Sequence, residues 1–189
     1  MKTVSSVMSH AKTNPQIVLR PQDLVVLLRL SLVPDAAPSY AALAGELGLT
    51  ASEVHAGVER AMAAQLARKD AAGRPLVLRE ALRQFVQQGA RYCFPATRGS
   101  STRGLPTGYA TAPLNALIVA PANEPPPVWP HKSGSVRGEA FYPLYPTVPE
   151  AAARNPALYE LLALFDAVRG GSARERGLAI DALDKRWAA

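Results

Sequence analysis

The sequence is poor in cysteine and in aromatic residues, and it contains no long run of apolar residues. A single cysteine, Cys93, among 189 residues excludes an intrachain disulfide and a zinc site built from several cysteines. We expect its side chain to fill a β-strand. The longest apolar run, Leu24 to Leu28, is far too short to cross a bilayer, and the N-terminus lacks the apolar centre of a signal peptide. These absences predict a cytoplasmic protein without a membrane-spanning segment.

Motifs for catalysis, metal binding and nucleotide binding are missing as well. The three histidines stand far apart, with no carboxylate at the spacing of metal ligands: His10, His55 and His131. Residues 98–104, RGSSTRG, have the glycine spacing of a phosphate-binding loop, but Leu105 and Pro106 replace the Lys and Ser/Thr that such a loop requires. No serine lies in a GxSxG motif. We therefore expect no catalytic residue, no metal and no cofactor, and we interpret the protein as a non-enzyme.

The sequence does have an excess of positive charge, with a formal net charge of +6. The excess is +3 in residues 1–90, +2 in residues 91–150 and +1 in residues 151–189. A polyanionic partner would attract such a chain, although an ordinary solvated surface can produce the same gentle gradient. Charge alone therefore favours a polyanion as partner without identifying it.

Residues 40–59, YAALAGELGLTASEVHAGVE, have the spacing of two short helices joined by a tight turn. Ala44 is small enough for a helix crossing, and Gly48 can adopt the positive φ of the corner. A capping box begins at Thr50, which predicts a new helix over residues 51–65. The pattern is typical of a helix-turn-helix unit, whose second helix enters the major groove in DNA-binding proteins.

The flanking segments complete this unit. Residues 20–33, RPQDLVVLLRLSLV, predict a buried helix, and Ser39 can cap the first helix of the pair. Residues 67–78, ARKDAAGRPLVL, predict a β-hairpin with a basic tip. A further helix is expected over residues 79–88, with Gly89 as its C-cap.

Together these elements resemble the winged helix-turn-helix domains of bacterial transcriptional regulators, MarR-like in the broad sense, over residues of about 20–88. Ala44, Gly48 and Val54 carry the match, and Gly57 departs from it because a larger apolar residue is usual there. The resemblance implies that the second helix reads double-stranded DNA while the hairpin tip contacts the backbone or the minor groove. It implies the following DNA-contacting residues: Ser39, Tyr40, Thr50, Ala51, Ser52, His55, Ala56, Glu59, Arg60, Arg68, Lys69 and Arg74.

The chemistry of these residues sets what each can do. Ser52 and His55 can hydrogen-bond base edges, Ala56 can contact a thymine methyl group, and Glu59 can accept from cytosine N4. The set is poor in arginine, so affinity would depend on four cations at its rim: Arg60, Arg68, Lys69 and Arg74. The alternative is a helical hairpin that packs other protein and touches no nucleic acid.

The second half of the chain has more proline and glycine, with short β-prone runs. These runs are Arg91–Phe94, Leu117–Ala120 and Val136–Tyr142. Residues 98–104 predict a flexible basic loop or, alternatively, a second phosphate contact through Arg98 and Arg103. Lys132–Ser135 predict the turn of a β-hairpin. Two final helices are expected, one beginning at Asn155 and one opened by a capping box at Ser172. Their apolar stripes indicate an intramolecular core or, alternatively, a dimer interface.

The sequence thus predicts an α+β fold: a winged helix-turn-helix, then a small region with a β-hairpin, then two C-terminal helices. We expect an N-terminal arm over residues 1–19, a DNA-binding domain over 20–90 and a dimerisation or effector-sensing region over 91–189. We interpret the chain as a sequence-specific transcriptional regulator, a homodimeric repressor. Four aromatic residues form either core or a site for a small-molecule or protein effector: Trp129, Phe141, Tyr142 and Tyr145. The alternatives are a protein-interaction module, such as an antitoxin or assembly adaptor, and an RNA-associated factor.

Overall fold

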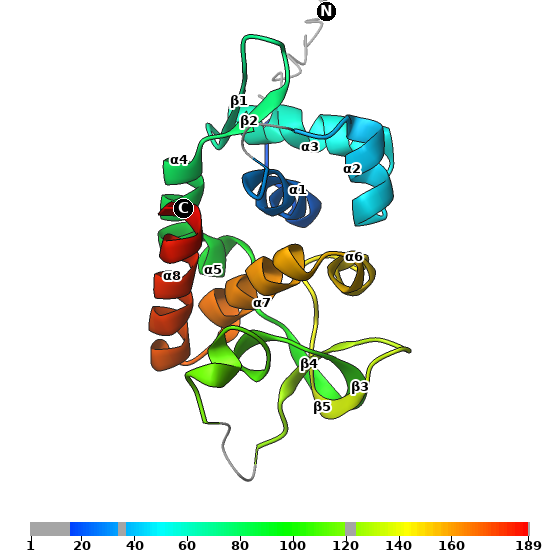
Figure 1. Ribbon diagram of the computed structural model, residues 1–189, viewed down its shortest axis with the longest axis vertical. Coiled ribbons are helices and arrows are strands. Elements are labelled where there is room, and N and C mark those ends of the chain that lie inside the picture. The colour runs from blue at the N-terminus through cyan, green and yellow to red at the C-terminus, as the bar shows by residue number, and fades with distance from the viewer. Residues whose placement is uncertain (1–15, 34–36, 120–123, 189) are drawn as a thin grey trace, which may run out of the picture.

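The computed structural model describes residues 16–33, 37–119 and 124–188, so most of the predicted arm over residues 1–19 lies outside the described residues. The fold is a mixture of helices and two small sheets, in agreement with the predicted α+β class. Three helices and a β-hairpin occupy one end of the molecule, and a three-stranded barrel occupies the other (Figure 1). Helix α7 (Pro156–Gly170) lies between the two ends.

The N-terminal helices begin within one residue of the predicted starts and end within two residues of the predicted ends. The elements of this region are α1 (Pro21–Ser31), α2 (Tyr40–Leu47), α3 (Ala51–Ala63), β1 (Ala67–Lys69) and β2 (Pro75–Val77). Ser39 Oγ accepts a hydrogen bond from the Ala42 amide at 3.2 Å, and the capping box at Thr50 is formed. Gly48 ends α2 with a φ of +66°, as the corner requires. Strands β1 and β2 pair antiparallel, which confirms the predicted hairpin.

The helix after the hairpin is longer than expected. It runs through α4 (Arg79–Gln84), a π-helical turn (Phe85–Gly89) and α5 (Ala90–Cys93). The predicted C-cap at Gly89 is therefore wrong: a Cβ there would lie 3.3 Å from the Phe85 ring, so glycine allows the widened turn to continue. The predicted strand Arg91–Phe94 is also wrong, because the helix continues to Cys93. Cys93 is therefore exposed at a helix end instead of filling a strand.

The barrel corrects two further expectations. Residues 98–104 form most of a strand, β3 (Arg98–Pro106), whose register shifts between Gly99 and Ser101, instead of a flexible loop. Strand β3 pairs antiparallel with both β4 (Pro127–Pro130) and β5 (Val136–Phe141), while β4 and β5 pair with each other in parallel. The expected hairpin turning at Lys132–Ser135 is thus absent, because the two flanking strands share β3 as their antiparallel partner.

Two glycines allow the three strands to approach so closely. A Cβ on Gly104 would lie 2.0 Å from the Trp129 carbonyl oxygen, and one on Gly138 would lie 2.0 Å from the Pro126 carbonyl oxygen. Any other residue would separate the strands. Between β3 and β4 the chain makes 3-10 turns at Gly108–Ala110 and Leu114–Ala116. The expected strand Leu117–Ala120 is wrong as far as it is described, since residues 117–119 form a turn and an irregular segment and Ala120 lies outside the described residues.

The C-terminal helices are α6 (Val148–Arg154), α7 and α8 (Ala173–Ala188). Asn155 caps α7 by accepting from the Leu158 amide at 3.1 Å, and Ser172 bonds Glu175 before α8, as predicted. The apolar residues of α7, with Ala179, Leu183 and Trp187 of α8, belong to one hydrophobic core that also includes α1 and α3. Of the two interpretations of the apolar stripes, the intramolecular core is the one observed.

Most of the four aromatic residues of the middle region also belong to the core and not to an open site. Trp129 and Phe141 are buried, Tyr145 packs against the core and Tyr142 is exposed. Among the described residues, no helix combines the length and hydropathy that a membrane crossing requires.

A closed polar cluster joins α7 to the barrel. Asp166, 2% exposed, accepts hydrogen bonds from Thr107 Oγ1 at 2.7 Å, from Trp129 Nε1 at 2.6 Å and from Arg169 Nε at 2.7 Å. Arg169 also donates to the Tyr142 carbonyl at 2.7 Å. Burial raises the pKa of Asp166, while the Arg169 guanidinium and the three donors oppose that shift. The cluster fixes the register of α7 against the sheet.

Candidate functional site

Helix α3 has one buried and one exposed face. Val54, Val58 and Ala61 are at most 1% exposed and pack into the core. The opposite face carries the residues predicted to contact bases: Ala51, Ser52, His55 and Glu59 are exposed, and Ala56 is half-buried. The helix lies at one end of the molecule, with the β1–β2 hairpin projecting beside it (Figure 1). We call this side of the helix the α3 face; it is formed by Ala51, Ser52, His55, Ala56 and Glu59.

Two contacts order the side chains of the α3 face. The rings of Tyr40 and His55 meet edge to face, with centroids 5.4 Å apart, so the start of α2 supports the middle of α3. His55 Nε2 lies 3.8 Å from Glu59 Oε1, one helical turn further along. His55 and Glu59 therefore lie side by side on the exposed surface of α3.

Thr50 is engaged in the capping box. Its hydroxyl oxygen accepts from the Glu53 amide at 3.2 Å and lies 2.8 Å from Glu53 Oε2. The Thr50 amide donates to the same carboxylate, and this bond lowers the pKa of Glu53. Thr50 therefore acts first as the start of α3, and its hydroxyl is already hydrogen-bonded.

Arg60, predicted at the cationic rim, turns toward α1. Its Nε and Nη2 donate to Asp23 Oδ2 and Oδ1, each at 2.7 Å, and Asp23 is fully buried. The bidentate bond raises the pKa of Arg60. Gly57 provides the space, because a Cβ there would lie 2.9 Å from Asp23 Oδ1. The departure from the helix-turn-helix pattern at Gly57 thus has a steric cause, and Asp23 is the residue that sequence reasoning missed.

The other rim cations lie on the hairpin. Lys69 Nζ is 3.2 Å from Glu59 Oε1, which joins β1 to the α3 face. Arg74 Nε is 2.8 Å from Asp70 Oδ2, and Asp70 also accepts from the Ala72 and Arg74 amides to shape the turn. These bonds, the Arg74 amide first, lower the pKa of Asp70. Arg68 is exposed and forms no ion pair with the part of the chain that the structure describes. Three of the four rim cations therefore hold carboxylates of this protein.

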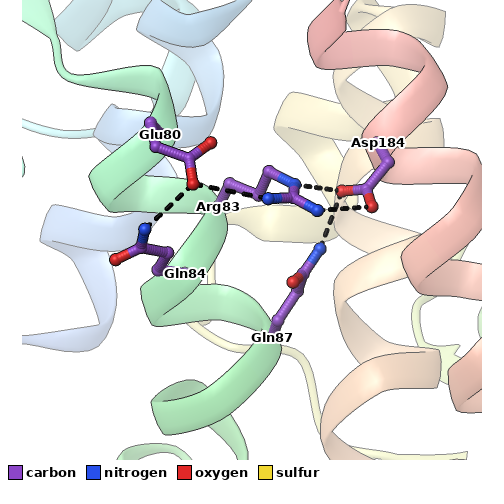
Figure 2. Close-up of polar contacts among 5 residues, drawn as sticks. All are labelled: Glu80, Arg83, Gln84, Gln87 and Asp184. Atoms are coloured by element: carbon purple, nitrogen blue, oxygen red, sulfur yellow. Dashed lines mark hydrogen bonds and ion pairs between the residues drawn. The ribbon is translucent and has the colours of Figure 1, made fainter.

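A second polar cluster connects the helix after the hairpin to the C-terminal helix (Figure 2). Arg83 of α4 donates from Nε and Nη2 to the two oxygens of Asp184 on α8, at 2.6 and 2.9 Å. Gln87 Nε2 donates to the same carboxylate at 2.7 Å, and Arg83 also contacts Glu80. The bond from Arg83 lowers the pKa of Asp184. The cluster fixes α4, which begins directly after the hairpin, against α8.

The α3 face thus brings together Ser52, His55 and Glu59. Tyr40 contacts His55, and Lys69 of β1 contacts Glu59, with Arg68 next to it in the strand. Ser39 remains the cap of α2. Hydrogen-bonding side chains are exposed there, and the described residues contain no group of three or more His, Cys, Asp or Glu placed to hold a metal ion. Comparison of the chain with protein-family models, curated proteins and solved structures found no match.

Proposed function

We propose that the protein is a sequence-specific regulator of transcription that binds double-stranded DNA through the α3 face, as a homodimeric repressor. In this proposal α1 to α3 and the β1–β2 hairpin act as a winged helix-turn-helix. The observation that carries it is the exposed polar side of α3, which lies at one end of the molecule beside a projecting two-stranded hairpin. A helix so placed can enter a major groove without hindrance from the part of the chain that the structure describes.

Ser52 and His55 would contact base edges in the major groove, and Ala56 would meet a thymine methyl group. Glu59 already holds Lys69 and His55, so it would orient these two side chains more than read a base. Arg68, which forms no ion pair within the described residues, and the amides at the start of α3 would bind phosphate. With so few unengaged cations around α3, we expect the α3 face to contribute a shallow salt dependence, a slope of about −1 to −2 per protomer.

A homodimer would let two α3 helices read adjacent half-sites. The apolar residues of α7 from Leu158 to Val168 are at most 1% exposed, so the dimer contact would use other surfaces. An effector could bind in a cavity of about 380 Å³ at the base of the hairpin, between Leu30, Leu76 and Arg79. Its volume suits a small organic molecule.

The second candidate is a protein-interaction module, such as an antitoxin or assembly adaptor. One observation favours it: the internal ion pairs of Arg60, Lys69 and Arg74 leave little positive charge around α3. A partner protein contacting the α3 face would not need that charge.

The test is a gel-shift titration with the chain's own promoter fragment against a scrambled duplex of equal length. Ser52→Ala/His55→Ala should lower the ratio of the two affinities about tenfold or more, because each lost base contact is worth about 1–3 kcal/mol. Gln88→Ala/Asn115→Ala, two exposed polar residues outside α3, should leave the ratio unchanged.

An unchanged ratio in the α3 variant would overturn the proposal. Binding of a co-purified protein that the α3 variant abolishes, with no preference for the promoter, would establish the interaction module instead.

A further inference from the structure

The barrel, which lies at the opposite end of the molecule from α3 (Figure 1), carries a second group of positive charges. Arg103 of β3 and Arg137 of β5 are direct partners in the antiparallel register, so both side chains leave the same face of the sheet. Both are exposed, as is Lys132 in the connection from β4 to β5. We call Arg103, Lys132 and Arg137 the basic corner.

No carboxylate neutralises the basic corner within the described ranges. Glu139, two residues from Arg137, pairs with Arg98. Glu150 of α6 lies 3.2 Å from His131 Nε2, beside Lys132 in sequence. These two carboxylates are thus paired with other residues. Like charges that face each other across a strand pair destabilise a sheet.

The backbone holds the corner in a fixed shape. The His131 amide donates to the Arg103 carbonyl at 3.2 Å, and the Gly134 amide donates to the His131 carbonyl at 3.0 Å. A Cβ on Gly134 would lie 2.3 Å from the Gly104 carbonyl carbon, so the connection lies directly on β3. The three cations therefore project from a preformed surface, which lowers the entropic cost of binding an anion.

We propose that the basic corner binds the sugar-phosphate backbone of duplex DNA. Guanidinium groups bind phosphate in bidentate geometry. The backbones of two paired β-strands lie about 5 Å apart, so Arg103 on β3 and Arg137 on β5 can face successive phosphates of the DNA. Single-stranded nucleic acid is disfavoured because its binding relies on exposed aromatic residues. The exposed tyrosines of the described chain, Tyr92 and Tyr142, lie outside the corner.

Because the corner belongs to the barrel and the α3 face to the helical end of the molecule, one molecule would hold two separate segments of DNA. Such bridging of two DNA segments rests on the proposed function of α3. The binding of DNA by the basic corner does not depend on it. The corner would add sequence-independent affinity and bring a bound operator close to a second stretch of duplex.

The first experiment measures the affinity of the full chain for a short fluorescent duplex of scrambled sequence over a series of salt concentrations. Arg103→Gln/Arg137→Gln should reduce the slope of log affinity against log salt by about 2, one for each lost phosphate contact. The matched control, Arg91→Gln/Arg174→Gln, removes two other arginines outside any described ion pair and should change the slope much less. The melting temperature of the corner variant should not fall, since it relieves a repulsion.

Equal slopes for the corner and control variants would overturn the proposal. So would unchanged duplex binding together with lost binding to phosphatidylserine vesicles, which would assign the corner to a membrane surface. A lower melting temperature with an unchanged slope would show a structural role only, and would overturn it too.

The second experiment measures bridging, as capture of a labelled duplex by protein bound to an immobilised promoter fragment. The corner variant should lose capture and keep its preference for the promoter. Ser52→Ala/His55→Ala tests the α3 proposal separately, so loss of salt slope in the corner variant without any promoter preference would support the corner and reject the α3 reading face.

Discussion

The N-terminal and C-terminal regions each bury one aspartate, and they do so in different ways. Asp23 lies in the first turn of α1 and is held by Arg60, whose side chain reaches in from α3 and remains 18% exposed. Asp166 lies in the middle of α7, where Arg169 is 4% exposed and Thr107 and Trp129 complete the set of donors. The first pair is a connection at the edge of the core, and the second is a closed network within it.

The difference shows how each region is positioned. Helix α3 packs its apolar face into the core with α1, and the ion pair between the two helices has an Arg60 side chain that is 18% exposed, so the orientation of α3 depends on few polar contacts. Helix α7 is fixed to the barrel by three contacts: Thr107 and Trp129 donate to Asp166, and Arg169 donates to the Tyr142 carbonyl. A low local dielectric strengthens such bonds and also makes the loss of any one of them more costly.

The largest expected effect is at Asp166. Asp166→Ala leaves the Arg169 guanidinium buried without its carboxylate, which should cost about 3–5 kcal/mol of unfolding free energy. The melting temperature should fall by roughly 10 °C, as judged from about 2–4 °C per kcal/mol in a chain of this size. Urea denaturation followed by circular dichroism measures the change. Asp23→Ala should cost less, because Arg60 can turn to water, and equal losses would contradict the distinction drawn between the two pairs.

A smaller effect is expected at Gly57, which leaves room for Asp23. In Gly57→Ala the new methyl group would meet Asp23 Oδ1, and the strain should exceed the gain in helix propensity by about 1–2 kcal/mol. Gly45→Ala is the matched control, since nothing lies within 4 Å of a Cβ at that exposed position of α2. It should stabilise the protein by about 0.4–1 kcal/mol. Thermal unfolding of both variants decides, and a stabilised Gly57→Ala would show that Asp23 is not confined.

The smallest effect concerns the contact between the two regions, Arg83 with Asp184. Asp184→Asn should cost at most about 1 kcal/mol near neutral pH, because both side chains are about one-third exposed. The bond to Arg83 lowers the pKa of Asp184 in the folded state, so its stabilisation is present above the unfolded value of about 3.9 and is lost as the pH falls further.

Urea denaturation at several pH values should therefore show wild type and Asp184→Asn converging below about pH 3.9. Glu80→Gln, at a carboxylate that is 66% exposed, is the control and should have a smaller effect at every pH. A constant difference between wild type and Asp184→Asn across the acid range would mean that the variant acts by some means other than charge.

Local signals predicted the N-terminal half and the caps of the last helices. Ser39, Thr50 and Asn155 each bond an amide three residues ahead, and Gly48 supplies a positive φ, so a short window of sequence contains the whole interaction. The exposure of Ser52 and His55 followed from helical periodicity in the same way.

The barrel and the ion pairs could not be predicted by such means. Strand β3 lacks a continuous apolar face because its outer residues are polar and its inner ones include Gly104, so it resembled a loop. The parallel pairing of β4 with β5 and the bond from Arg60 to Asp23, 37 residues apart, depend on tertiary packing that no local window contains. Gly57 did give a local signal: a glycine where the helix-turn-helix pattern has a larger apolar residue indicates that another group, here the Asp23 carboxylate, lies against the helix.

The contact between α1 and α7 has a practical consequence for protein engineering. Residues 20–90 cannot be grafted onto an unrelated scaffold as a self-sufficient unit, since the side of α1 that α7 covers would be exposed. A chimaera would have to carry α7 along or substitute polar residues on that side.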